Sequence, residues 1–218
     1  MRKSKTIIFL LCGIVFGLAA FPVFAQETKN ISINPQPLRN LGKELKEKIE
    51  RGEIDFDKPF KVVLETVLTK DGKFDREKSK FTLTEGDAQM IDIVKSGIGA
   101  IGDSGIFGYL RNSGAEQIKL TVVQDGETFS ILVESEQKDE SKANTMASVF
   151  NTLIRALKLF DENGTQKLDE NAKILISGFQ TPIANGKNVI LNFVLPQQTF
   201  KDLILRSLPK TNNNQSGE

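Results

Sequence analysis

The feature that most constrains the fold is a unit of strand, turn, strand and helix that occurs three times along the chain. Each unit has two stretches of alternating apolar residues, a pattern that predicts strands, and then a stretch with helical spacing. The turns between the paired strands fall at residues 70–73, 124–127 and 184–187. Each contains Asp-Gly or Asn-Gly, which favour tight hairpins because both residues tolerate positive φ. The units recur at roughly 55–60 residues, a spacing that indicates an internal repeat.

Hairpins joined by helices predict an α+β fold. We expect a mostly antiparallel sheet of about six strands, built from the three units, with the helices on one face. The first strand runs from Phe60 to Leu68, and a long helix closes the second unit from about Lys138 to Phe160. The first strand of the third unit is expected to begin at Ile174 and Ile176.

The N-terminal segment has the three-part pattern of a secretory signal peptide. Three cations, Arg2, Lys3 and Lys5, precede an apolar run over residues 6–20, and the run ends in Val-Phe-Ala at 23–25. The pattern predicts a signal peptide over residues 1–25, cleavage after Ala25, and a periplasmic or secreted location.

Two alternatives compete with cleavage. The apolar run could stay as an uncleaved anchor, because about 20 apolar residues span a bilayer. A lipoprotein is disfavoured because leucines, not a small residue, precede Cys12.

The remaining chain divides into three parts. Residues 26–58 are predicted to form a flexible lead-in followed by an amphipathic helix, which either packs on the main domain or binds a partner. Residues 59–208 form the α+β domain, and the polar residues 209–218 are expected to be disordered. The apolar positions of the helix are Leu38, Leu41, Leu45 and Ile49.

Composition argues against most kinds of catalysis. The chain has no histidine, and its single cysteine, Cys12, lies in the signal peptide. The commonest general base and the commonest ligands of zinc are therefore missing, and we expect no enzymatic activity, no cofactor and no metal. Removing the three cations of the signal peptide leaves 26 basic against 28 acidic residues, a formal charge of −2. This balance lacks the basic patch typical of nucleic-acid binding.

Several short motifs resemble functional sites but lack their context. Residues 97–102 spell G-x-G-x-x-G, yet they fall in a helical stretch and do not follow a strand. Residues 102–105 match the segment around a serine-protease nucleophile without any histidine to activate it. Ser135 and Lys138 form S-x-x-K among acidic neighbours, which favours an ordinary strand-to-helix junction. Residues 161–165 with Asp169 have the acidic character of a calcium loop, but not the spacing of an EF-hand.

Two segments resemble domains of the TonB family, the periplasmic parts of bacterial energy transducers. The first is the strand, Lys-Asp-Gly-Lys turn and second strand within residues 60–105. The second is the Pro-x-x-Asn-Gly-Lys stretch beginning at Pro182, followed by a strand that ends at Leu195-Pro196. The resemblance implies a non-catalytic domain that binds outer-membrane receptors by strand addition. The chain lacks the long spacer of that family, and cleavage after Ala25 would remove the membrane anchor that energy transduction needs.

These observations predict an exported binding or scaffolding protein of the bacterial envelope, with a protein partner and no membrane span after cleavage. Sheet edges that could accept a partner strand motivate this hypothesis. The alternative is a carrier of an apolar ligand, held between the sheet and the long helix of residues 138–160. A hydrolase using Ser135 and Lys138 is the third hypothesis. The sequence leaves the partner, the ligand and the oligomeric state open.

Overall fold

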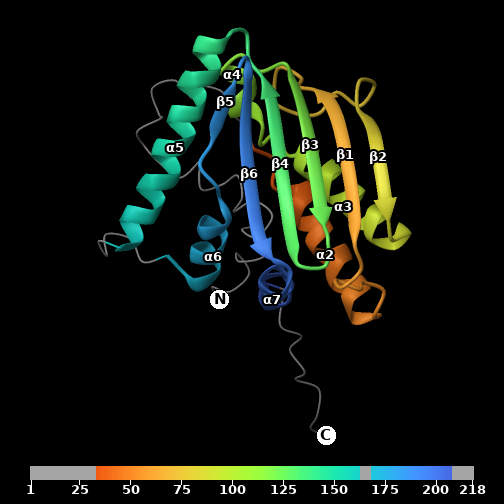
Figure 1. Ribbon diagram of the computed structural model, residues 1–218. Helices are drawn as coiled ribbons and strands as arrows, with labels where there is room; N and C mark the ends of the chain where they lie inside the picture. The colour runs from red at the N-terminus through yellow and green to blue at the C-terminus, as the bar shows by residue number, and fades with distance from the viewer. Residues whose placement is uncertain (1–32, 163–167, 208–218) are drawn as a thin grey trace, which may run out of the picture.

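The computed structural model describes residues 33–162 and 168–207, and it contains one open sheet of six antiparallel strands (Figure 1). The order across the sheet is β2-β1-β3-β4-β6-β5. The α+β class, the strand number and the antiparallel arrangement are therefore confirmed. The strands are β1 (Phe60–Val67), β2 (Lys80–Gly86), β3 (Gln117–Gln124), β4 (Thr128–Glu136), β5 (Ile183–Asn185) and β6 (Asn188–Pro196).

Six helices are described along the same residues. Figure 1 shows α2 and α3 behind the sheet, α7 at the end of β6, and α5 beside the β5 edge. Contacts of α5 with β5 and β6, and of α7 with β4 and β6, agree with this arrangement. The helices are α2 (Gln36–Glu50), α3 (Ala88–Asp103), α4 (Gly108–Asn112), α5 (Glu140–Glu162), α6 (Glu170–Gly178) and α7 (Gln197–Ser207).

Aspartates begin three of these helices. Before α3, Asp87 Oδ1 accepts hydrogen bonds from the backbone N–H groups of Gln89 and Met90, at 3.1 and 3.0 Å. Asp139 and Asp169 accept in the same way at the starts of α5 and α6, each at 2.8 Å. The aspartates thus satisfy N–H groups that have no partner within the helix. The bond from the Met90 N–H is the largest cause of the lowered pKa of Asp87.

Two of the three predicted hairpins turn as expected. Between β3 and β4, Asp125 Oδ1 accepts from the N–H groups of Glu127 and Thr128, and Gly126 has a φ of +97°. The backbone bond to Thr128 is the largest cause of the lowered pKa of Asp125. Between β5 and β6, Gly186 provides the positive φ, +57°, of a two-residue turn.

The first hairpin is more elaborate than the tight turn that the sequence predicts. Leu68 and Phe74 pair across the expected turn, but β2 begins only at Lys80, after a second loop. The side chain of Phe74 is buried and stacks on Phe107, with ring centroids 5.3 Å apart. The strand pairing is therefore interrupted between Phe74 and Lys80.

The prediction for the start of the third unit is wrong. Ile174 and Ile176 belong to helix α6, and the strand before the last turn is only the three-residue β5. A short apolar run does not distinguish a strand from a buried helix by periodicity alone. The deciding feature is Asp169, which caps the N-terminus of the helix. Phe179 forms only an isolated bridge to Phe193 before β5 begins.

Strand register divides the sheet into a covered and an open face. Val62, Val122, Ile131 and Phe193 lie in one row across β1, β3, β4 and β6. Because successive side chains alternate between faces, this row points toward the helices and contributes to the single hydrophobic core. The residues that follow or precede them on each strand point to the other face, which none of the described helices crosses in Figure 1.

The amphipathic helix α2 belongs to the core. Leu38 and Leu41 are both 4% exposed, and α2 packs against α3. The sequence left two interpretations of this helix open, packing on the main domain or binding a partner. In the structure the helix packs on the domain. Among the residues that the structure describes, no helix is both long and apolar enough to cross a membrane.

Candidate ligand-binding site

An apolar cavity of about 100 Å³ lies between the covered face of the sheet and the helices. Its sheet side is formed by Phe60, Val122, Phe129, Ile131 and Phe193. These residues come from four neighbouring strands and lie at the end of the sheet where α7 begins. The cavity therefore borders the main core and is partly open to the surface.

The opposite wall comes from helices that are far apart in the sequence. Met90, Val94 and Ile98 lie one turn apart on α3, so a single side of this helix faces the cavity. The other lining residues are Leu41 and Leu45 of α2, Ile54 and Phe56 of the loop after α2, Ile93, Gly97 and Ile101 of α3, Leu175 of α6, and Phe200, Leu203 and Ile204 of α7.

Within the described part of the chain, no polar or charged side chain lines the cavity. An empty cavity of this size costs about 2.4 kcal/mol of stability, at about 24 cal/mol per Å³. Ile131 borders this unfilled space. It lies between the buried Val122 and Phe193 in one register row, yet its own side chain remains partly exposed. The helices thus leave the middle of this row uncovered.

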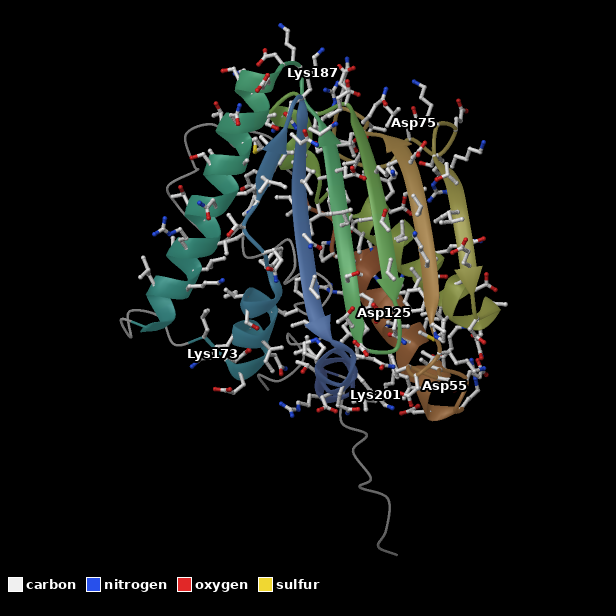
Figure 2. All side chains as sticks on the ribbon, in the orientation of Figure 1. Asp55, Asp75, Asp125, Lys173, Lys187 and Lys201 are labelled. Carbon is white, nitrogen blue, oxygen red and sulfur yellow. The ribbon has the colours of Figure 1, made fainter. Side chains whose placement is uncertain are left out.

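Polar contacts hold the loop between α2 and β1 over one end of the cavity. The carbonyl oxygen of Phe56 accepts hydrogen bonds from the side-chain amides of Gln124 and of Gln197, the latter at 2.6 Å. Lys201 of α7 forms an ion pair with Asp57 at 3.1 Å. Figure 2 shows Lys201, Asp55 and Asp125 at this same end of the sheet. These contacts position Phe56, whose ring lines the cavity.

Two glycines of α3 differ in their relation to the cavity. Gly97 lines it, and a Cβ built there meets only Leu41 Cδ2, at 3.8 Å, an ordinary contact distance. Gly99, two residues further, is exposed, and a Cβ there meets nothing within 4 Å. A side chain at position 97 would therefore enter the cavity, whereas one at position 99 would point away from it.

Of the three glycines in the motif of residues 97–102, only Gly102 packs closely against another segment. All six residues lie within α3, as expected from the helical pattern. Gly102 packs against Phe74, since a Cβ there would overlap the ring. Similarly, a Cβ at Gly72 would overlap the backbone of Gly108. Gly105, with φ +74°, follows the C-terminus of α3.

The structure does not bring Ser135 and Lys138 into a reactive arrangement. Ser135 is fully buried on β4, and its Oγ accepts a hydrogen bond from the Gln137 side-chain amide at 2.9 Å. Lys138 is exposed. Ser104, in the protease-like segment, is also buried and donates to the carbonyl oxygen of Ile101 at 2.6 Å.

The calcium-loop motif falls mostly outside the described residues. Asp161 lies near the end of α5, residues 163–165 are not described, and Asp169 caps α6. Among the residues that the structure does describe, no group of three or more acidic side chains is placed to hold a metal ion.

The alternative hypothesis from the sequence is an apolar ligand held between the sheet and the long helix, but the cavity lies elsewhere. None of the described side chains of α5 lines it, because α5 packs along β5 and β6 at the edge of the sheet. The walls come instead from α2, α3 and α7. The sequence signals that could have located the cavity are the apolar stripe of α2 and a glycine, Gly97, on the apolar side of α3.

No family model, curated protein or solved structure matches this chain. The resemblance to the TonB family thus stays a prediction, and the site has to be interpreted from its own chemistry.

Proposed function

We propose that the protein is an exported, non-catalytic binding protein that takes up a small apolar ligand in the core cavity. The observation that carries this proposal is a cavity lined by apolar side chains alone among the described residues, at a cost in stability that a bound ligand would offset. The predicted export signal places this binding outside the cytoplasm.

The size and lining of the cavity indicate the class of ligand. An engineered cavity of about 150 Å³ with similar aliphatic and aromatic walls stays dry and binds benzene or xenon. A volume of about 100 Å³ suits a small ring or a few methylene groups, such as the end of a short acyl chain. A charged group would lose its hydration and find no partner among the described lining residues. The ligand is therefore uncharged, or it places only an apolar end in the cavity.

Benzene and xenon are suitable probes for the purified protein. We expect each to shift the methyl NMR signals of Val122 and Ile131, and to raise the melting temperature. Ligand at 100 times its dissociation constant stabilises a folded protein by about 2.7 kcal/mol.

Gly97→Leu tests whether the cavity is the binding site, and Gly99→Leu is its matched control on the same helix. The side chain of Gly97→Leu would occupy the cavity and should abolish the response to benzene, whereas Gly99→Leu should retain it. No response in the unmodified protein, or an equal response in both variants, would contradict the proposal.

A further inference from the structure

A buried amide oxygen beside one end of the cavity has no hydrogen-bond partner among the residues that the structure describes. It is Oε1 of Gln124, the last residue of β3, whose side chain is 1% exposed. Both hydrogens of the same amide are used, because Nε2 donates to the carbonyl oxygens of Phe56 and of Lys58, the latter at 3.0 Å. The unpaired atom is therefore the oxygen, and only a hydrogen-bond donor can satisfy it. Leaving such a buried acceptor unpaired lowers stability.

Gln124 is surrounded by residues that line the cavity. It pairs with Phe60 of β1 on one side and with Phe129 of β4 on the other, and both of these line the cavity. Residues directly opposite in antiparallel strands have Cβ atoms about 4.5–5.5 Å apart. Val122, two residues earlier and on the same face, also lines it, as does Phe56, whose carbonyl oxygen binds the amide. The amide thus borders the apolar lining, although Gln124 is not itself part of it.

Two further buried polar atoms in the described part of the chain lack a partner, and both lie at the other end of the sheet. They are Arg111 Nε and Gln137 Oε1. Arg111 belongs to α4, and the backbone N–H of Gln137 donates to the carbonyl oxygen of Lys187. Figures 1 and 2 show α4 and Lys187 at one end of the sheet, and Asp125, the neighbour of Gln124, at the opposite end. Of the three atoms, only Gln124 Oε1 is therefore placed to meet a ligand in the cavity.

We propose that the ligand is an uncharged hydroxyl compound, which donates a hydrogen bond to Gln124 Oε1 while its apolar body fills the cavity. This inference rests on the proposed binding function and narrows the class of ligand. The ligand is uncharged because the described lining residues offer no partner to a charge. A ketone or ether of the same size would bring a second acceptor toward Oε1, and both hydrogens of the Gln124 amide are already used.

Phenol and toluene are matched probes, because they carry a hydroxyl and a methyl group, respectively, on the same ring. We expect both to bind the purified protein in competition with benzene, and phenol to bind at least as tightly as toluene in calorimetric titrations. A hydroxyl loses its hydration on entering the cavity, so a site without an acceptor would prefer toluene. Phenol, but not toluene, should also shift the NMR signals of the Gln124 side-chain amide.

Gln124→Met removes the acceptor and keeps an unbranched side chain of similar length. It should lower the ratio of phenol affinity to toluene affinity by about 10-fold, because the hydroxyl then enters the site without a partner. Gln197→Met is the matched control. Gln197 also donates to the carbonyl oxygen of Phe56, so this variant weakens the same loop contact but leaves the Gln124 oxygen in place. It should keep the affinity ratio of the unmodified protein.

The outcomes separate this inference from the function on which it rests. If benzene, toluene and phenol all fail to bind, the cavity is not a binding site and both proposals fail. If toluene binds but phenol binds more weakly, or if both variants change the affinity ratio equally, only the hydroxyl proposal is overturned. If Gln124→Met does not fold, the NMR signals of the unmodified protein decide, and a Gln124 amide unchanged by phenol would overturn the inference.

Discussion

At the scale of single residues, small differences in side-chain volume decide how α3 packs. Its glycines lie in three environments: Gly97 borders the cavity, Gly99 faces solvent, and Gly102 touches the ring of Phe74. The spacing of these glycines in the sequence does not reveal the three environments. Only the neighbours brought by tertiary packing distinguish them.

The contact between Gly102 and Phe74 leads to a stability prediction. In Gly102→Ala, the added Cβ would overlap the buried Phe74 ring, which is itself stacked on Phe107. Overpacking of this kind costs about 1–3 kcal/mol, so we expect the free energy of unfolding to fall by about that amount in urea denaturation.

Gly99→Ala is the control for this change. It adds the same methyl group to the same helix, in open space, and removes the conformational freedom of a glycine in the unfolded chain. It should therefore stabilise the protein by about 0.5–1 kcal/mol. Equal effects of the two substitutions on the free energy of unfolding would show that contact with Phe74 does not restrict the size of the side chain at position 102.

At the scale of elements, α2 illustrates how a segment outside the repeated units becomes part of the core. Its apolar stripe predicts a helix, but a stripe alone does not say what it covers. In the structure the stripe packs on α3, and Leu41 and Leu45 form part of the cavity wall. The helix is thus needed to complete a core that the three units leave open.

Leu41→Ala tests this role of α2. Leu41 is 4% exposed, and truncating a buried leucine costs about 2–5 kcal/mol. We expect a loss in this range, measured by chemical denaturation. Leu205→Ala on α7, where the leucine is 42% exposed, should change stability by less than about 0.5 kcal/mol. A similarly small effect of Leu41→Ala would mean that α2 contributes little to the folded unit.

At the scale of the whole molecule, most of the buried apolar side chains form one contiguous core, whereas Leu38 and Leu41 of α2 are buried but lie outside this cluster. It extends from Phe56, after α2, to Ile204 of α7, and it includes residues of every described strand except β2 and β5. A single core that joins distant segments favours cooperative, all-or-none unfolding.

Two spectroscopic signals can test this cooperativity. Tyr109 of α4 is the only tyrosine and the chain has no tryptophan, so tyrosine fluorescence reports one location, whereas far-UV circular dichroism reports all helices and strands. We expect the two urea transitions to coincide. A midpoint for circular dichroism well below that of Tyr109 would indicate that some helices detach before the core unfolds.

Local signals account for the parts of the fold that the sequence predicts correctly. The glycines at 126 and 186 permit the positive φ of two hairpin turns, and alternating apolar residues specify which face of each strand is buried. Asp87 and Asp139 cap two of the expected helices, α3 and α5. These preferences act between neighbours in the chain, so that they can be recognised without knowing the tertiary structure.

The presence and position of the cavity, by contrast, depend on the tertiary structure. Whether Ile131 is covered depends on how closely α2, α3 and α7 approach the sheet, and no local pattern encodes that distance. The third unit differs, because the local N-cap Asp169 accompanies the helix α6 where the apolar run alone did not distinguish a helix from a strand. The repeat of strand, turn, strand and helix thus specified an antiparallel α+β sheet. Contacts between segments far apart in the sequence decided where the core beside that sheet is left unfilled. The volume of this space depends on several elements at once, so no single segment of the sequence specifies it.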